Sequence, residues 1–199
     1  MRINGYEIKP GAYLIGANLM NANLQGVDLN GAMLICANLE SANLKTACLV
    51  NTDFKDACCT SANFERADLA RAWLAFTDFT RANLTSATLI YTYMEEADLS
   101  NAKLEHANLA HADLADATLT EANLAGALLV GADLHGTDFT GANLEYANLG
   151  GANLTDANLT GANLKGADFT GANLTGTRLD NIKNACLAGA YIPQPKGKK

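Results

Sequence analysis

A strict repeat of five residues constrains the fold of this chain more than any other feature. From Leu14 to Leu179 every fifth residue is apolar, and 27 of these 34 positions hold Leu. The remaining seven positions hold larger or smaller apolar residues, namely Phe54, Cys59, Phe64, Phe79, Met94, Phe139 and Phe169. The residue two positions before each of them is Ala in 28 cases, and the residue between is most often Asn or Asp. Because the register never slips, one repeating structure must accommodate the whole stretch.

A period of five fits neither standard element of secondary structure. In an α-helix five residues advance about 500°, so the Leu side chains would spiral around the helix and no single face could be buried. In a straight β-strand, successive Leu side chains would point to opposite faces. If the chain instead turns a corner once in every pentad, every Leu returns to the same interior. The sequence therefore predicts an all-β solenoid with one continuous core, which includes Leu14 and the seven residues named above.

The residues after each Leu are suited to the corners of such a solenoid. Asn and Asp bond to nearby backbone groups in turns, and Gly tolerates a positive φ angle. The second residue after each Leu is often Gly near the N-terminus and again from Gly126 onward, but no Gly occupies this position between Cys36 and Glu121. The middle third of the chain is therefore expected to carry side chains at its corners where the C-terminal third presents bare backbone.

The run Ala-Asn-Leu, seen at 142–144, 152–154 and 162–164 and in the last case completed by Gly166, resembles the pentapeptide repeat family. This resemblance covers roughly five sixths of the chain. It implies a right-handed quadrilateral parallel β-helix with four pentapeptides per coil, so that residue n lies beside residue n+20. The repeats then form about 8.5 to 9 coils, and at about 4.8 Å per stacked strand the rod is roughly 40 Å long.

The repeat also divides the chain into four predicted segments. Residues 1–11 form an N-terminal cap, and residues 12–179 form the β-helix. Leu187 follows Leu179 at eight residues instead of five, so residues 180–192 are interpreted as an insertion and a final coil that acts as the C-terminal cap. Residues 193–199 form a basic flexible tail. Neither end offers an amphipathic helix for dimerisation, and we expect a monomer.

Charge and composition exclude several classes of protein. The net charge is −7, and three of the 14 basic residues are Lys196, Lys198 and Lys199. The rest of the chain is therefore more acidic still, which disfavours direct binding of nucleic acid, since phosphate contacts need clustered Lys and Arg. No apolar run is long enough to span a membrane, and the N-terminus lacks the pattern of a signal peptide. These absences predict a cytoplasmic protein. The five cysteines show no CxxC spacing, so we expect free thiols.

Side chains that would support catalysis do not converge in the sequence. His106, His111 and Asp116 come nearest to a metal-binding set, but they occupy different corners of the predicted solenoid. Cys59 falls at a core position, where a thiol is inert, and none of the common catalytic motifs is present. We therefore expect no enzymatic activity, no cofactor and no metal.

Stacking of residue n on residue n+20 gathers large side chains on one part of the surface. Trp73 lies beside Tyr93 with Phe76 close by, while Tyr91 and Ile90 lie around the next corner. The candidate partner-binding patch consists of Arg71, Trp73, Phe76, Ile90, Tyr91 and Tyr93. Exposed patches with Trp, Tyr and Arg are typical of protein interfaces. The alternative is a surface ladder whose stacked rings only stabilise adjacent coils, and the sequence leaves both interpretations open.

Acidic residues cluster just C-terminal to this patch. The group on the same face comprises Glu95, Glu96, Asp113, Asp116 and Asp133. These residues either steer a basic partner toward the aromatic side chains or simply keep the rod soluble.

The favoured function is a non-enzymatic rigid scaffold for protein–protein interaction. The family resemblance implies one alternative, a mimic of duplex DNA that binds a type II topoisomerase such as gyrase, as the quinolone-resistance members do. Duplex DNA carries one charge per about 1.7 Å, so a rod of roughly 40 Å needs about 24 negative charges to match it, far more than the net charge of −7. A structural spacer without a specific partner is the other alternative.

Overall fold

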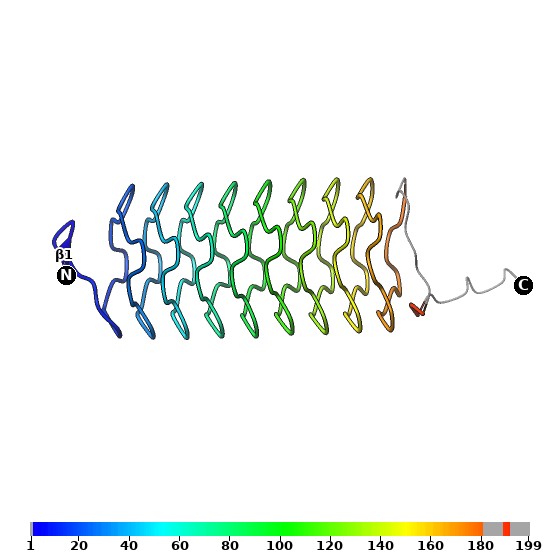
Figure 1. Cartoon of the computed structure of the whole chain (residues 1–199), viewed down its shortest axis with the longest axis horizontal. Coiled ribbons are helices and arrows are strands. Elements are labelled where there is room, and N and C mark those ends of the chain that lie inside the picture. Colours follow the sequence, from blue (N-terminus) through cyan, green and yellow to red (C-terminus); the bar gives the residue numbers. More distant parts are fainter. Residues whose placement is uncertain (1, 181–188, 192–199) are drawn as a thin grey trace, which may run out of the picture.

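The computed structural model describes residues 2–180 and 189–191, which form a straight rod of coils that follow one another from the N-terminus to the C-terminus (Figure 1). The two elements long enough to be numbered lie at the N-terminal end, where β1 (Arg2–Ile3) pairs antiparallel with β2 (Tyr6–Glu7). The described residues include no helix long and apolar enough to cross a membrane. The rod itself is built from short parallel bridges between coils.

These bridges define the coil. They join residue n to residue n+20 from Tyr13 and Met33 through to Asn158 and Arg178. Each coil therefore holds 20 residues, or four pentapeptides, and its bridging residue stands between the Ala and the Leu of each repeat. The right-handed quadrilateral β-helix predicted from the repeat is confirmed.

The interior is a single column of apolar side chains. Leu14 is 2% exposed and the other seven named core residues are fully buried. Phe54 and Phe64 meet edge to face with ring centroids 6.1 Å apart, and Phe64 meets Phe79 in the next coil at 5.5 Å. Cys59 lies between the first two rings in the chain and 20 residues before the third. Burial raises the pKa of the Cys59 thiol well above its ordinary value, so the thiol stays protonated and unreactive.

Threonine replaces the core alanine at a few positions without leaving a polar group unpaired. The buried Thr52, Thr77 and Thr137 hydroxyls each donate to a carbonyl oxygen 23 residues earlier, at 2.9 to 3.0 Å. Among the described residues, every buried side-chain nitrogen or oxygen has a hydrogen-bond partner. The buried Thr92 hydroxyl instead donates to the Leu89 carbonyl oxygen in its own coil at 2.8 Å. The core therefore accepts a small polar side chain where a backbone carbonyl can accept its hydrogen bond.

The corners combine two local devices. The Asn or Asp of each repeat accepts the backbone N–H two residues later, as Asp78 does from Thr80 and Asp98 from Ser100, both at 2.8 Å. From Gly16 to Gly176, the second residue after each core residue adopts the left-handed conformation whether or not it is Gly, as shown by φ values of 58° at Thr46 and 59° at Phe76. This conformation is strained for non-glycine residues, and the surrounding coils hold it in place.

The structure describes more of the N-terminal end of the chain than of the C-terminal end. At the N-terminus, Ile8 is buried, and Ile3 and Tyr6 of the β1–β2 hairpin pack against the core. At the other end, Tyr191 bridges to Asn173. Most of the predicted final coil at 180–192 lies outside the described residues, as does the whole predicted tail at 193–199.

Candidate functional site

The exposed aromatic side chains in the middle of the rod line an open groove of about 430 Å³. We call it the aromatic groove, and its lining residues are Asn51, Arg71, Trp73, Tyr91 and Tyr93. The first wall is a corner column, since Asn51, Arg71 and Tyr91 occupy the same corner of three successive coils. The second wall belongs to the adjoining flat face, where Trp73 and Tyr93 are bridged neighbours.

The Trp73 and Tyr93 rings stack in parallel on that face. Their centroids are 4.4 Å apart and their planes differ by 22°. The contact follows directly from the coil, because residues 20 apart are neighbours at the spacing of adjacent strands. Trp73 is nevertheless 52% exposed and Tyr93 45% exposed, so the outer side of the stacked pair faces solvent.

Tyr91 stacks on a residue of the following coil, whereas Tyr93 stacks on a residue of the preceding coil. The Tyr91 ring lies 5.1 Å from the His111 ring at an angle of 10°. Arg71 and Tyr91, both members of the predicted patch, line the groove, and the ring partner of Tyr91 is His111. Tyr91 and His111 are 20 residues apart, so the sequence predicts that they are neighbours. The sequence does not show toward which coil a corner side chain leans.

Glycines in the following coil explain why the histidine side chains at the corners lean toward that coil. A Cβ atom added to Gly126 would lie 2.6 Å from Nδ1 of His106, and one added to Gly131 would lie 2.7 Å from Nδ1 of His111. Each histidine therefore leans over the bare corner of the following coil. The two histidines occupy different corners, and no group of three potential metal ligands occurs among the described residues.

The remaining patch residues are more dispersed than predicted. Phe76 is 45% exposed but lies at the opposite corner of the face, with Nζ of Lys55 5.6 Å above its ring centroid. Ile90 is half-buried on the corner beside Tyr91 and does not line the groove. The structure thus brings together Arg71, Trp73, Tyr91 and Tyr93 and adds Asn51, which the sequence analysis missed although it precedes Arg71 by 20 residues.

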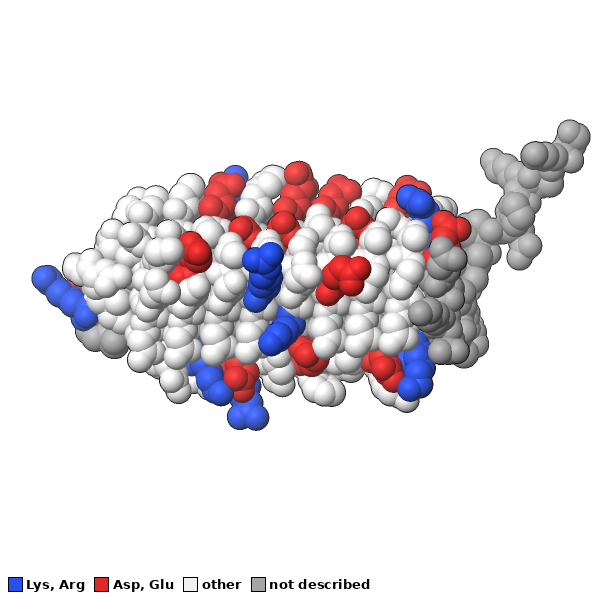
Figure 2. All heavy atoms as spheres, turned by 90° about the horizontal axis from the view of Figure 1, so that it is seen from above, with Lys and Arg blue, Asp and Glu red and all other residues white. Residues whose placement is uncertain are grey.

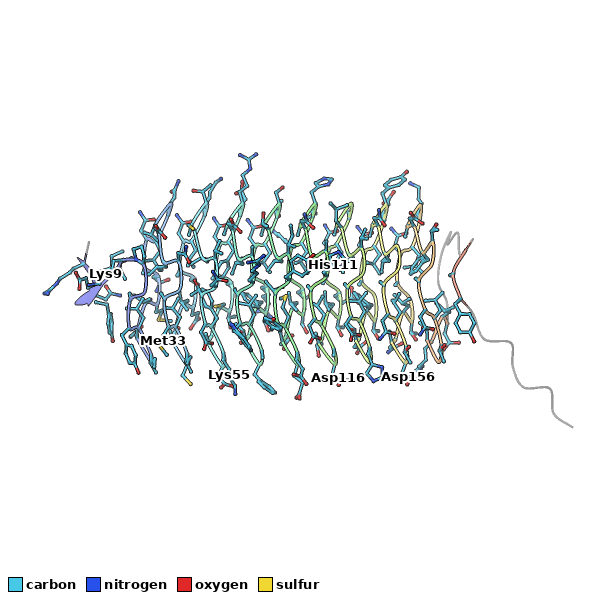
Figure 3. The ribbon with its side chains drawn as sticks, turned by 90° about the horizontal axis from the view of Figure 1, so that it is seen from below. Lys9, Met33, Lys55, His111, Asp116 and Asp156 are labelled. Carbon is cyan, nitrogen blue, oxygen red and sulfur yellow. The ribbon has the colours of Figure 1, made fainter. Side chains whose placement is uncertain are left out.

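Charge differs between the two edges of this face. The corner that follows Trp73 and Tyr93 in the chain carries acids in four coils, with none in the coils of Phe76 and His135, and Figure 3 shows Lys55, Asp116 and Asp156 along this edge of the rod. Acidic side chains also gather along one edge in the space-filling view (Figure 2). The acids on the face and this corner, none of which forms an ion pair within residues 2–180 and 189–191, are Asp53, Asp56, Glu95, Glu96, Asp113, Asp116, Asp133 and Asp156.

Arg71 marks the other edge. It is exposed, and it has no ion pair with any described residue. The aromatic groove therefore has a cation on one side and a row of carboxylates on the other. Such an arrangement suits a ligand that carries both apolar groups and charge.

Comparison with known proteins agrees with the fold. The family model for pentapeptide repeats matches in eight copies, and the matched stretches are 12–49, 47–85, 62–101, 97–136, 117–156 and 137–176. No curated protein sequence matches the chain.

Solved structures give the same picture. The full-length structure of QnrB1, a plasmid-mediated fluoroquinolone resistance protein, is 18% identical over 90% of both chains with a TM-score of 0.70. HetL, a pentapeptide repeat protein involved in heterocyst differentiation regulation in the cyanobacterium Nostoc, is 32% identical over 84% of this chain and 88% of its own, with a TM-score of 0.33. Rfr23 from the cyanobacterium Cyanothece is 44% identical over 47% of this chain and 62% of its own, with a TM-score of 0.39. The chain belongs to the pentapeptide repeat family.

Proposed function

We propose that the protein is a non-enzymatic rigid scaffold that binds a partner protein through the aromatic groove. The observation that carries this proposal is the side-by-side exposure of Trp73, Tyr91 and Tyr93 next to the unpaired Arg71. Trp, Tyr and Arg contribute most of the binding energy at protein interfaces. The rod supplies a preformed surface, so binding requires little loss of conformational freedom.

The ladder interpretation accounts for the stacking of Trp73 and Tyr93 but gives no role to Arg71, which lines the same groove. A stacked pair stabilises adjacent coils by about 0.5 to 1.5 kcal/mol, and smaller side chains already hold the coils together elsewhere. The two interpretations predict different effects of removing the rings. A ladder loses stability only, whereas a docking site loses a partner.

Affinity purification of the tagged protein from its native cell tests this proposal. The double variant Trp73→Ser, Tyr93→Ser removes the stacked pair, and Tyr146→Ser is the matched control, since Tyr146 is 63% exposed at a different corner. We expect the wild type and the control to retain a partner that the double variant loses, and the purified partner to bind the wild type directly. Equal retention by all three proteins, with each folded by circular dichroism, would rule out the groove as the docking site.

Mimicry of DNA is the second candidate, and the acidic corner is the observation in its favour. The fold is shared with QnrB1 at low identity. Against it, the Lys55 and Arg71 side chains interrupt the negative surface next to the groove. A gyrase supercoiling assay with added protein distinguishes the scaffold from the DNA mimic. For a scaffold, we expect that micromolar protein neither inhibits gyrase nor protects it from a fluoroquinolone.

A further inference from the structure

We propose that the segment of the partner that enters the aromatic groove is a basic amphipathic α-helix lying parallel to the rod axis. This inference depends on the proposed function above and adds the chemistry of the partner. It follows from the spacing of the coils, from the pairing of their backbone groups and from the charges at the two edges of the groove.

The spacing of the coils favours a helix over an extended segment. Successive coils are about 4.8 Å apart, a helical turn rises about 5.4 Å, and side chains on one side of a strand repeat every 6.8 Å or so. Over four coil steps, about 19 Å, four helical turns overshoot by only about 2.4 Å, whereas four strand repeats overshoot by about 8 Å. A helix with apolar residues at i, i+4, i+7 and i+11 therefore stays in register with the coils.

The surface offers such a helix an apolar strip, in which four of the five residues are half-buried and the last is exposed. Beside the groove, one corner position carries small or aliphatic residues in five successive coils, namely Val50, Ala70, Ile90, Ala110 and Val130. Val130 is 37% exposed, and Leu128 next to it is 43% exposed. The strip runs along the rod axis, and the groove opens at its middle.

Backbone pairing argues against addition of a strand at this face. The Trp73 N–H donates to Thr52 at 2.9 Å and its carbonyl accepts from Phe54 at 2.7 Å, while the Tyr93 N–H donates to Ala72 and its carbonyl accepts from Leu74. The backbone groups beneath the groove are thus already used within the rod. A partner must bind here through side chains, as an amphipathic helix does in a groove.

The charges set the orientation of the helix. Lys or Arg along one flank of the helix would face Glu95, Glu96 and Asp116, and an acidic residue on the other flank would face Arg71. Because the carboxylates outnumber the cations around the groove, the partner helix is basic overall.

Peptide selection against the full-length protein tests this inference. Three displayed libraries of equal length are compared: one with apolar residues at helical spacing and a Lys/Arg flank, one with the same composition but alternating apolar and basic residues, and one helical with Glu in place of Lys and Arg. The Trp73→Ser, Tyr93→Ser variant serves to remove peptides that bind elsewhere. We expect only the basic helical library to yield peptides specific for the wild type.

Two spectroscopic readouts follow binding of the selected peptides. Trp73 is the sole tryptophan of the chain, so its fluorescence reports on the groove directly. The described part of the rod contains no helix, so a gain of circular dichroism at 222 nm on mixing comes from a peptide that folds into a helix. We further expect Glu95→Gln, Glu96→Gln to weaken binding roughly fivefold, and Arg71→Ala to abolish any preference for an acidic residue on the opposite flank.

The outcomes separate this inference from the proposed function. Selection of alternating or acidic peptides, or binding without helical dichroism, would contradict the helix while leaving the groove as a docking site. Failure of all three libraries, when affinity purification still gives a partner that depends on Trp73 and Tyr93, would also overturn the helix alone. Partner retention that is insensitive to the double variant would overturn the proposed function itself.

Discussion

At the scale of single residues, the corners carry the conformational strain of the rod. Non-glycine residues from Asn21 to Asp156 adopt a left-handed conformation at the second position after the Leu. For an L-residue this costs roughly 1 to 2 kcal/mol, and β-branched residues are the least tolerant. The corner side chains in the middle third, which include Asn51, Arg71 and Tyr91 of the aromatic groove, are therefore present in spite of their conformational cost.

Replacement of Thr46 by Gly should stabilise the protein. Thr46 is β-branched at φ 58°, and Gly adopts this angle without strain. We expect the free energy of unfolding in urea to rise by about 1 kcal/mol. The reverse change, Gly151→Ala, is the control, since an added Cβ atom there would meet nothing within 4 Å and the cost is conformational; a stabilising Gly151→Ala would contradict this explanation.

Restoring the consensus Leu at Cys59 should destabilise the protein. The cysteine lies among Phe54, Phe64 and Phe79, which fill the space that a Leu would need. We expect Cys59→Leu to lower the free energy of unfolding by about 1 to 3 kcal/mol through overpacking. Met94→Leu also restores the consensus but conserves volume, so it should cost less than about 1.5 kcal/mol. Equal effects of the two variants on the urea midpoint would refute the packing argument.

At the scale of the coil, side-chain ladders join neighbouring repeats. On one face, Asn83 donates to Asn63 at 3.1 Å and Asn63 to Asn43 at 3.3 Å, and Asn163 donates to Asn143 farther along. Lys103 occupies the same column and interrupts this ladder. The ladder stops at Lys103 because a Lys side chain has no atom that can accept a hydrogen bond from the Asn of the next coil.

Completing this ladder should increase stability. In Lys103→Asn, the new amide reaches Asn83 on one side and Asn123 on the other, whose Nδ2 currently donates to Glu105 at 2.7 Å. Each added hydrogen bond contributes about 0.5 to 1.5 kcal/mol. We expect a higher urea midpoint for Lys103→Asn and a lower one for the converse variant Asn63→Lys; a lower midpoint for Lys103→Asn would show that the ladder is not stabilising.

Ion pairs between coils should make the rod sensitive to acid. Lys45 pairs with Glu65 at 2.8 Å, and Lys165 with Glu145 at 2.7 Å. Hydrogen bonds from these lysines hold the pKa of Glu65 and Glu145 below the ordinary value. A lowered pKa in the folded state contributes stability above the unfolded pKa, and this is lost as pH falls through the folded one.

The expected result is a melting temperature that drops as the pH falls from 5 to 3. The variant Glu65→Gln, Glu145→Gln removes both paired carboxylates and should show a smaller drop than the wild type. The measurement is thermal denaturation followed by circular dichroism across this range. An identical drop in both proteins would show that the two ion pairs do not contribute.

At the scale of the whole molecule, the repeat determined most of what could be predicted. The continuous core and the corners followed from the spacing of Leu and Ala, and the family resemblance supplied the number of four pentapeptides per coil. That number of four, implied by the resemblance, placed Trp73 against Tyr93. The groove was less predictable, because its shape depends on how corner side chains lean: Tyr91 toward His111, and His111 over the bare backbone of Gly131.

The function proposed for the rod depends on one arrangement, the coil of 20 residues that makes neighbours of Trp73 and Tyr93. Nuclear Overhauser contacts from the indole of Trp73 test it most directly, since the sole tryptophan gives an unambiguous resonance. The ring centroids lie 4.4 Å apart, and we predict strong contacts between the indole protons and the Tyr93 ring. Contacts from the indole to Thr88 or Asp98 in place of Tyr93 would indicate a coil of 15 or 25 residues and contradict the account.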